Sequence, residues 1–196
     1  MNHSSADSAF HASQAQQAAR RRLLLWGGGA VAGLAGAGLA AWRTRIGEVK
    51  ETQPQALWGS SFVGLGGETL QMASMRGRPL LLNFWATWCP PCVQELPLLN
   101  AFYGEHRGKG WQVLGLAIDQ PANVQKFLQR MPLDFPVALG GLGGIDLSRD
   151  LGNDKGGLPF TVMFAANGSV SKRKIGQLTE NDLASWGRAL ESKVRA

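Results

Sequence analysis

The residues best suited to chemistry are the two cysteines, Cys89 and Cys92, which lie three positions apart. A structural disulfide framework uses more cysteines and closes longer loops, so this pair is either redox-active or half of a metal site. Tetrahedral zinc would need further ligands, and the three histidines, His3, His11 and His106, are not spaced as a second ligand pair. We therefore interpret the pair as a dithiol and disulfide couple that uses no metal and no other cofactor.

The surroundings of the pair favour thiol-disulfide exchange. The apolar run 79–86 predicts a strand buried on both faces, and it ends just before the cysteines. Pro91 fits the first turn of a following helix, where a missing N–H costs nothing. Cys89 would then lie at the positive end of the helix dipole, near free backbone N–H groups that stabilise a thiolate. We expect Cys89 to attack a disulfide and Cys92, one turn into the helix and less exposed, to resolve the mixed disulfide.

The residues beside Cys89 are candidates for substrate contact. Trp88 precedes the cysteine and is expected to shield or present the thiol, and Pro90 follows it. Trp85 belongs to the apolar run and is expected to pack in the core.

The remaining pattern predicts an α/β fold in which helices flank a central mixed sheet. A short hairpin or strand is expected within 64–74, ahead of the buried strand. The elements expected after the motif helix are a strand at 111–118, a helix at 122–130, a short strand at 135–139, a short helix at 145–151, strands at 159–166 and 169–178, and a final helix capped by Thr179 and Asp182. The alternation of strands and helices predicts parallel pairing, whereas the turn signal at residues 167–168 predicts an antiparallel hairpin.

The amino-terminal part has the composition of an export segment. Residues 1–22 are mostly polar or small, end in three arginines, and are predicted to be disordered on the cytoplasmic side. Residues 23–42 carry no charge, and as a helix at about 1.5 Å per residue they would span the roughly 30 Å hydrocarbon layer. Residues 43–57 are interpreted as a linker and 58–196 as the folded domain.

Two interpretations of residues 23–42 remain open. A retained transmembrane signal-anchor is favoured, because the apolar run exceeds the roughly 7 to 15 residues of a signal peptide core. A cleaved signal is the alternative, since residues 35–37 fit an A-x-A cleavage site and residues 20–24 resemble a twin-arginine signal. Both place the domain on the periplasmic side of a bacterial cytoplasmic membrane, either anchored or soluble.

The formal net charge is +6, and the lysines and arginines of the domain are scattered apart from residues 172–174. This distribution argues against nucleic-acid binding.

The chain resembles the membrane-anchored thioredoxins of the TlpA and ResA type over roughly residues 59–196. The resemblance is carried by four segments: LNFWATWCPPC at 82–92, Glu95, AID at 117–119 and GLPFT at 157–161. It implies a thioredoxin-like fold and a protein-disulfide oxidoreductase. Cytoplasmic thioredoxins have a buried aspartate where this chain has Asn83, so that residue's proton-relay role is not carried over.

The resemblance also implies roles for three further residues. Pro159 would form a cis peptide facing the cysteines, and the backbone of Leu158 would hydrogen-bond an extended substrate. Glu95 would lie beside the thiols, raise their pKa values and relay a proton. The simpler alternatives are a proline at the start of a strand for Pro159 and a surface helix residue for Glu95.

The predicted function is reduction of disulfides in exported proteins, in settings such as cytochrome c or oxidase assembly. A transmembrane electron donor of the DsbD or CcdA type would recycle the oxidised Cys89 and Cys92 pair. The loop before Pro159 lacks the signature of the CcmG branch, which leaves the client open. Two alternatives are a Cu(I) carrier for a respiratory centre, with the thiolates as soft ligands, and a thiol peroxidase of the same fold.

Overall fold

The computed structural model describes residues 54–194, and their side chains as far as residue 188. All of them belong to a compact unit spanning Glu51–Ala196. The predicted disordered terminus, the predicted membrane segment 23–42 and most of the predicted linker lie outside the described residues. Within the described part of the chain, no helix combines the length and the hydropathy needed to cross a membrane.

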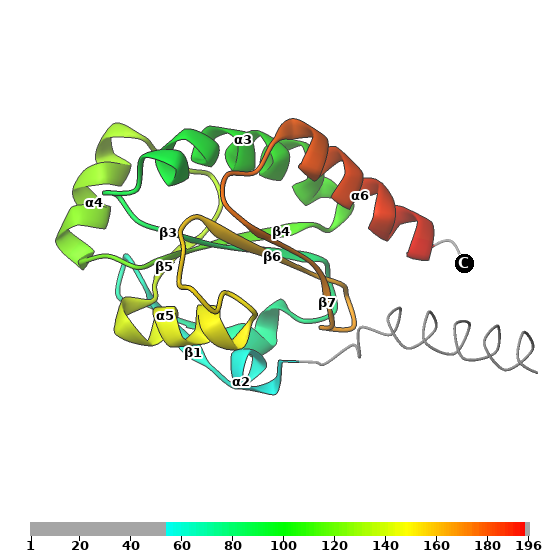
Figure 1. Cartoon of the computed structure of the whole chain (residues 1–196), viewed down its shortest axis with the longest axis horizontal. Coiled ribbons are helices and arrows are strands. Elements are labelled where there is room, and N and C mark those ends of the chain that lie inside the picture. Colours follow the sequence, from blue (N-terminus) through cyan, green and yellow to red (C-terminus); the bar gives the residue numbers. More distant parts are fainter. Residues whose placement is uncertain (1–53, 195–196) are drawn as a thin grey trace, which may run out of the picture. The chain divides into compact units, whose positions relative to one another are not determined.

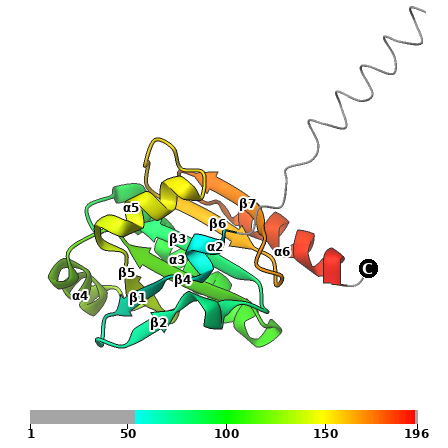
Figure 2. The ribbon, with the colours of Figure 1, turned by 90° about the horizontal axis from the view of Figure 1, so that it is seen from below.

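The strands of the described region form one mixed sheet. In chain order they are β1 (Ser61–Gly64), β2 (Thr69–Gln71), β3 (Leu80–Trp85), β4 (Gln112–Ala117), β5 (Val137–Leu139), β6 (Phe160–Phe164) and β7 (Val170–Ile175). Across the sheet the order is β2-β1-β5-β4-β3-β6-β7. The strands β3, β4 and β5 are parallel neighbours, and every other pairing is antiparallel. Figure 2 shows β2 and β7 at opposite edges.

Helices cover both faces of the sheet. They are α2 (Gln55–Trp58), α3 (Pro90–His106), α4 (Pro121–Arg130), α5 (Gly141–Asp150) and α6 (Glu180–Val194), with short 3-10 turns η1 (Met72–Met75) and η2 (Arg107–Lys109). In Figure 1 the helices α3, α4 and α6 lie on one side of the sheet, and α2 and α5 lie on the other. The α/β architecture with a mixed sheet flanked by helices is therefore confirmed.

The central strand β3 fixes the point from which the cysteine segment leaves the sheet. All six of its residues are buried. Leu81 and Trp85 pack in the cluster beneath α3, whereas Phe84 packs in the opposite cluster beneath α5. This two-sided burial is typical of a strand with helices on both faces, and it confirms the expectation for the run 79–86 and for Trp85.

Several elements begin or end away from their predicted limits. The helix α2 lies within the segment predicted as linker up to residue 57, because Leu57 and Trp58 are buried in the core. The folded region therefore begins before residue 58. The helix α5 starts at Gly141, before the predicted start at residue 145. The sequence pattern places this start too late because the first turn contains several glycines, which are weak helix formers.

Two predicted local signals are confirmed. The hairpin between β6 and β7 turns at Gly168, whose φ of 86° is a conformation that glycine adopts without strain. At the start of α6, Asp182 accepts a hydrogen bond from the Thr179 N–H at 2.8 Å, and Thr179 Oγ1 accepts one from the Asp182 N–H at 3.2 Å. These reciprocal bonds form the capping box expected from the sequence.

Candidate active site

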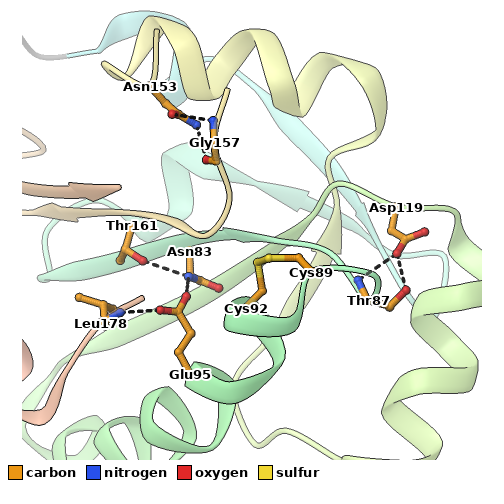
Figure 3. The surroundings of a disulfide bond; sticks show 10 residues. All are labelled: Asn83, Thr87, Cys89, Cys92, Glu95, Asp119, Asn153, Gly157, Thr161 and Leu178. Atoms are coloured by element: carbon orange, nitrogen blue, oxygen red, sulfur yellow. Dashed lines mark hydrogen bonds between the residues drawn. A yellow bond between two sulfur atoms is a disulfide. The ribbon is translucent and has the colours of Figure 1, made fainter. Parts of the chain in front are cut away.

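Cys89 and Cys92 form a disulfide at the start of α3 (Figure 3). Cys89 is the N-cap residue, and Cys92 lies in the first turn with its Cα atom 5.3 Å from that of Cys89. Cys89 is 5% exposed and Cys92 is fully buried, which agrees with the predicted order of accessibility. The sulfur pair is therefore approached from the Cys89 side.

The two prolines between the cysteines limit how this helix can stabilise a thiolate. The side chain of an N-cap residue normally accepts a hydrogen bond from the second or third N–H of the helix. Pro90 and Pro91 have no N–H, and the N–H of Val93 donates to the Cys89 carbonyl at 3.1 Å. Several free N–H groups were expected near Cys89, but only that of Cys92 is left among the first three helical positions. The helix dipole still favours a thiolate at Cys89, but fewer N–H groups can hydrogen-bond to its sulfur.

Glu95 lies inside the protein, three residues after Cys92 on α3. Its side chain is fully buried, so the alternative of a surface helix residue is wrong. One carboxylate oxygen accepts a hydrogen bond from Asn83 Nδ2 at 2.6 Å, and the other accepts one from the Leu178 N–H at 2.7 Å. Figure 3 shows the carboxylate held between β3 and the segment before α6.

Burial dominates the acidity of this carboxyl group. It raises the pKa of Glu95 to about 7, because a buried carboxylate loses its hydration. The hydrogen bonds from Leu178 and Asn83 oppose this effect, as does the charge of Lys174, but they do not overcome it. Glu95 can therefore gain or lose a proton near neutral pH.

Asn83 connects the buried carboxylate to strand β6. Its Nδ2 atom also donates to Thr161 Oγ1 at 2.9 Å. Its Oδ1 atom is buried and has no hydrogen-bond partner among the described residues. The amide group thus donates to Glu95 and Thr161, while its Oδ1 atom points toward the cysteine helix in Figure 3 without accepting a hydrogen bond from a described residue.

Asp119 holds the segment that leads to Cys89. It follows β4, and its Oδ2 atom accepts hydrogen bonds from the Thr87 N–H at 3.0 Å and from Thr87 Oγ1 at 2.5 Å. Its Oδ1 atom accepts hydrogen bonds from the Gln120 N–H at 2.7 Å and from Asn123 Nδ2 at 3.1 Å, at the start of α4. Partial burial alone would raise the pKa of Asp119, but these hydrogen bonds hold it below its ordinary value.

The Leu158–Pro159 peptide is cis, as the resemblance implied. Phe84 pairs with Phe160, so the antiparallel register places Pro159 across from the end of β3, where the cysteine segment begins. The Pro159 carbonyl accepts a hydrogen bond from the Gly176 N–H at 2.8 Å. Neither the N–H nor the C=O of Leu158 hydrogen-bonds to another described residue, and the Leu158 side chain is half-buried.

The predicted site residues meet at one end of the sheet, and two of them are open to solvent. Trp88 is 66% exposed beside the disulfide, and Pro90 is exposed as well. No group of three or more His, Cys, Asp or Glu residues suited to a metal ion occurs in the described part of the chain. The contacts between Asp119 and Thr87 were not expected from the sequence, because these residues become neighbours only in the fold. The burial of Asn153 was not expected either, because an asparagine among glycines normally predicts only a turn.

Comparison with known proteins supports the same chemistry. Residues 50–190 match the family model described as Redoxin. The chain is similar to "Thiol-disulfide oxidoreductase ResA" of Geobacillus thermodenitrificans, with 34% identity over 122 residues that cover 61% of this chain and 67% of the relative. Among solved structures it is similar to a thiol:disulfide interchange protein of the thioredoxin family from Chlorobium tepidum, with 27% identity and a TM-score of 0.59 over 67% of this chain and 92% of the other. StoA from Bacillus subtilis is 26% identical, with a TM-score of 0.54 over 65% of this chain and 95% of the other.

Proposed function

Because this chain belongs to the Redoxin family and is a thiol-disulfide oxidoreductase, we propose that it reduces disulfides of exported proteins. Its substrates are disulfide-containing client proteins. The observation that carries the proposal is the Cys89–Cys92 disulfide on a helix start, with a buried carboxyl group titrating near neutral pH one turn away. The relatives named as thiol-disulfide oxidoreductases favour exchange over Cu(I) carriage or peroxidase activity.

The proposed reaction transfers two electrons from the reduced pair to the client. The Cys89 thiolate attacks one client sulfur, a mixed disulfide forms, and the other client sulfur leaves as a thiolate. Cys92 then loses its proton and attacks Cys89, which restores the intramolecular disulfide and releases the second client thiolate. Glu95 accepts the Cys92 proton and passes it to the departing client sulfur, a role suited to a carboxyl whose pKa is near the working pH.

Client binding is proposed to use the backbone of Leu158. An extended client segment can pair with the N–H and C=O of that residue, since neither group hydrogen-bonds to another described residue and the neighbouring Pro159 lies across from the end of β3. Main-chain hydrogen bonds recognise any extended sequence, so the protein would accept disulfides in varied clients. Trp88 and Pro90, exposed beside Cys89, would supply apolar contact on the other side of the disulfide.

The direction of electron flow follows from how weakly the thiolate is stabilised. A strongly oxidising couple needs a stabilised thiolate in its reduced form. Here the prolines at positions 90 and 91 remove two N–H donors, and the carboxylate of Glu95 disfavours a second negative charge nearby. Both features favour the disulfide form of the protein and therefore a reducing couple.

The proposal also covers the cellular location of the protein and the proteins with which it exchanges electrons. Residues 23–42 would anchor the chain in a bacterial cytoplasmic membrane, or serve as a cleaved signal, with the folded domain on the periplasmic side. A transmembrane electron donor of the DsbD or CcdA type would re-reduce the pair. Clients would include exported proteins whose cysteines must be reduced before a cofactor is attached, as in cytochrome c or oxidase assembly.

The equilibrium between the purified protein and glutathione tests the direction. The fraction of reduced protein is measured by thiol alkylation over a series of ratios of reduced to oxidised glutathione. We expect the protein to remain mostly oxidised until reduced glutathione is in large excess. A protein that is mostly reduced in mildly oxidising mixtures would contradict the reductase assignment.

A further inference from the structure

We propose that Asn153 is a positioning residue for client binding, which fixes the backbone of Gly157 so that Leu158 presents its open N–H and C=O to the client. The inference rests on the proposed function and adds a residue to it. Asn153 lies outside every motif that points to the chemistry, in the loop between α5 and β6. Its role would be exerted through Leu158.

The Asn153 side chain binds both backbone groups of Gly157. Its Oδ1 atom accepts a hydrogen bond from the Gly157 N–H at 3.1 Å, and its Nδ2 atom donates to the Gly157 carbonyl at 2.9 Å. Asn153 is fully buried, so water does not compete for these bonds. Figure 3 shows the paired bonds between the two residues. An asparagine amide offers a donor and an acceptor in one plane, and it therefore imitates the edge of a β-strand.

The loop is also attached to the end of α5. The Asn153 N–H donates to the Ser148 carbonyl at 2.9 Å, and the Gly156 N–H donates to the Asn153 carbonyl at 2.8 Å. Gly152 and Gly156 have φ values of 101° and 64°, which glycine adopts without strain, so the chain can reverse tightly here. Residues 153–157 thus form a closed loop anchored to a helix that packs on the sheet.

Among residues 157–159, this arrangement leaves only the backbone of Leu158 without hydrogen bonds to other described residues. Gly157 has both backbone groups bound by Asn153. Pro159 has no N–H, and its carbonyl accepts a hydrogen bond from the Gly176 N–H. Leu158 lies between them, with neither group bound to another described residue. Because its neighbours are fixed on both sides, Leu158 is oriented before a client arrives, which reduces the entropy lost on binding.

The inference predicts a defect that depends on the substrate. A protein client needs the backbone of Leu158 to align its disulfide with Cys89. A small aromatic disulfide such as 5,5′-dithiobis(2-nitrobenzoate) has no peptide backbone and needs only access to the sulfur. Loss of the Asn153 bonds should therefore slow reduction of the first substrate and spare the second.

The experiment measures single-turnover rates of the prereduced full-length chain with insulin and with 5,5′-dithiobis(2-nitrobenzoate). We expect the ratio of the two rates to fall about tenfold in Asn153→Ala, as for a misplaced binding group. Both rates come from one sample, so the ratio is independent of the folded fraction. The potential of the cysteine pair should stay at the wild-type value.

The matched control is Asn167→Ala. Asn167 also shapes a turn, since its Oδ1 atom accepts hydrogen bonds from the Ser169 N–H at 2.9 Å and from Ser169 Oγ at 2.8 Å, but it lies at the opposite end of β6. Its rate ratio should match that of the wild type. A ratio in Asn153→Ala within twofold of wild type, or an equal fall in Asn167→Ala, would overturn the inference. Failure of the wild-type chain to reduce either substrate would instead overturn the proposed function.

Discussion

Glu95 shows how position in the fold changes the chemistry of a single residue. An ordinary glutamate on a helix is ionised at neutral pH, but this one is fully buried, and its burial raises its pKa to about 7. The hydrogen bonds from Asn83 and the Leu178 N–H hold its two oxygens in place. The residue therefore combines a fixed geometry with a proton that can be exchanged.

The pKa of Glu95 predicts how stability depends on pH. The folded-state value of about 7 lies above the ordinary value of 4.5, so the folded protein binds more protons than the unfolded chain between these values. The stabilisation is fully present below pH 4.5 and is lost as the pH rises through 7. In urea titrations of the oxidised protein, we expect the free energy of unfolding to fall by on the order of 2–3 kcal/mol from this group between pH 4.5 and 8.

Glu95→Gln should remove this part of the pH dependence, because glutamine does not titrate. Glu105→Gln is the matched control, since Glu105 is an exposed residue of the same helix. The control should keep the wild-type slope. Identical slopes in Glu95→Gln and wild type would show that burial does not perturb Glu95 in this way.

We expect the redox potential of the Cys89 and Cys92 pair to depend on Pro91. Pro91→Ala restores an N–H at the second helical position, where it can donate to the sulfur of Cys89. We expect the reduced form to be stabilised and the potential of the pair to rise by about 20–30 mV in glutathione titrations, equivalent to roughly 1 kcal/mol.

Pro97→Ala is the control for this prediction, because Pro97 lies in the same helix and is exposed, beyond the first turn. It should leave the potential unchanged. Equal shifts in both variants would mean that the missing N–H near Cys89 does not set the potential.

At the scale of elements, the site depends on links between segments that are distant in the chain. Asp119 joins the end of β4 to the segment before Cys89, and it also accepts hydrogen bonds from the Gln120 N–H and from Asn123 Nδ2 at the start of α4. One carboxylate makes both connections, and each of its two oxygens accepts two hydrogen bonds.

Asp119→Ala should lower the free energy of unfolding by about 1–3 kcal/mol, because it leaves the N–H groups of Thr87 and Gln120 without their acceptor. It should also slow the reaction of Cys89 with small disulfides, since the preceding segment is no longer held. Asp146→Ala removes an exposed carboxylate that pairs with Arg149 on α5 and serves as control. Similar losses in both variants, measured by urea unfolding and by stopped-flow kinetics, would refute the proposed link.

The elements themselves were largely predictable from the sequence, for local reasons. The two-sided apolar runs predicted β3 and β4, and the turn at residues 167–168 predicted the hairpin. The cap of α6 was visible as Thr179 and Asp182. Short α2 and the glycine-rich start of α5 were missed or misplaced, because their formation depends on burial against the sheet rather than on helix propensity.

The site was predictable only in part. The cysteines, Pro159 and Glu95 were found because they lie in recognisable segments. The contacts that tune them join residues far apart in the sequence, such as Glu95 with Leu178 and Asp119 with Thr87. Asn153 carried no signal at all, since an asparagine among glycines normally predicts only a turn.

At the scale of the whole domain, the sheet with helices on both faces forms a platform (Figure 1), and the disulfide lies at the start of α3, after the end of β3. The cysteine helix, the Leu158–Pro159 peptide and the Asp119 link converge there from three separate parts of the chain. We propose that this convergence provides an attacking sulfur, a place for a client backbone and a buried proton acceptor.

A trapping experiment tests the proposed setting of this platform. In cells that express the full-length Cys92→Ser chain, the mixed disulfide at Cys89 cannot be resolved and should accumulate. We expect the trapped partners to be exported proteins, recovered in the membrane or periplasmic fraction. Cytoplasmic proteins as the main partners would contradict the proposed location.

The most direct test of the account is a comparison of insulin reduction by the wild-type, Cys89→Ser and Cys92→Ser proteins after prereduction. The account predicts that the wild type reduces insulin and becomes fully oxidised at the Cys89 and Cys92 pair. It also predicts that Cys92→Ser stops at a covalent one-to-one adduct and that Cys89→Ser does not react. Insulin reduction by Cys89→Ser at the wild-type rate, or none by the wild type, would contradict the central claim.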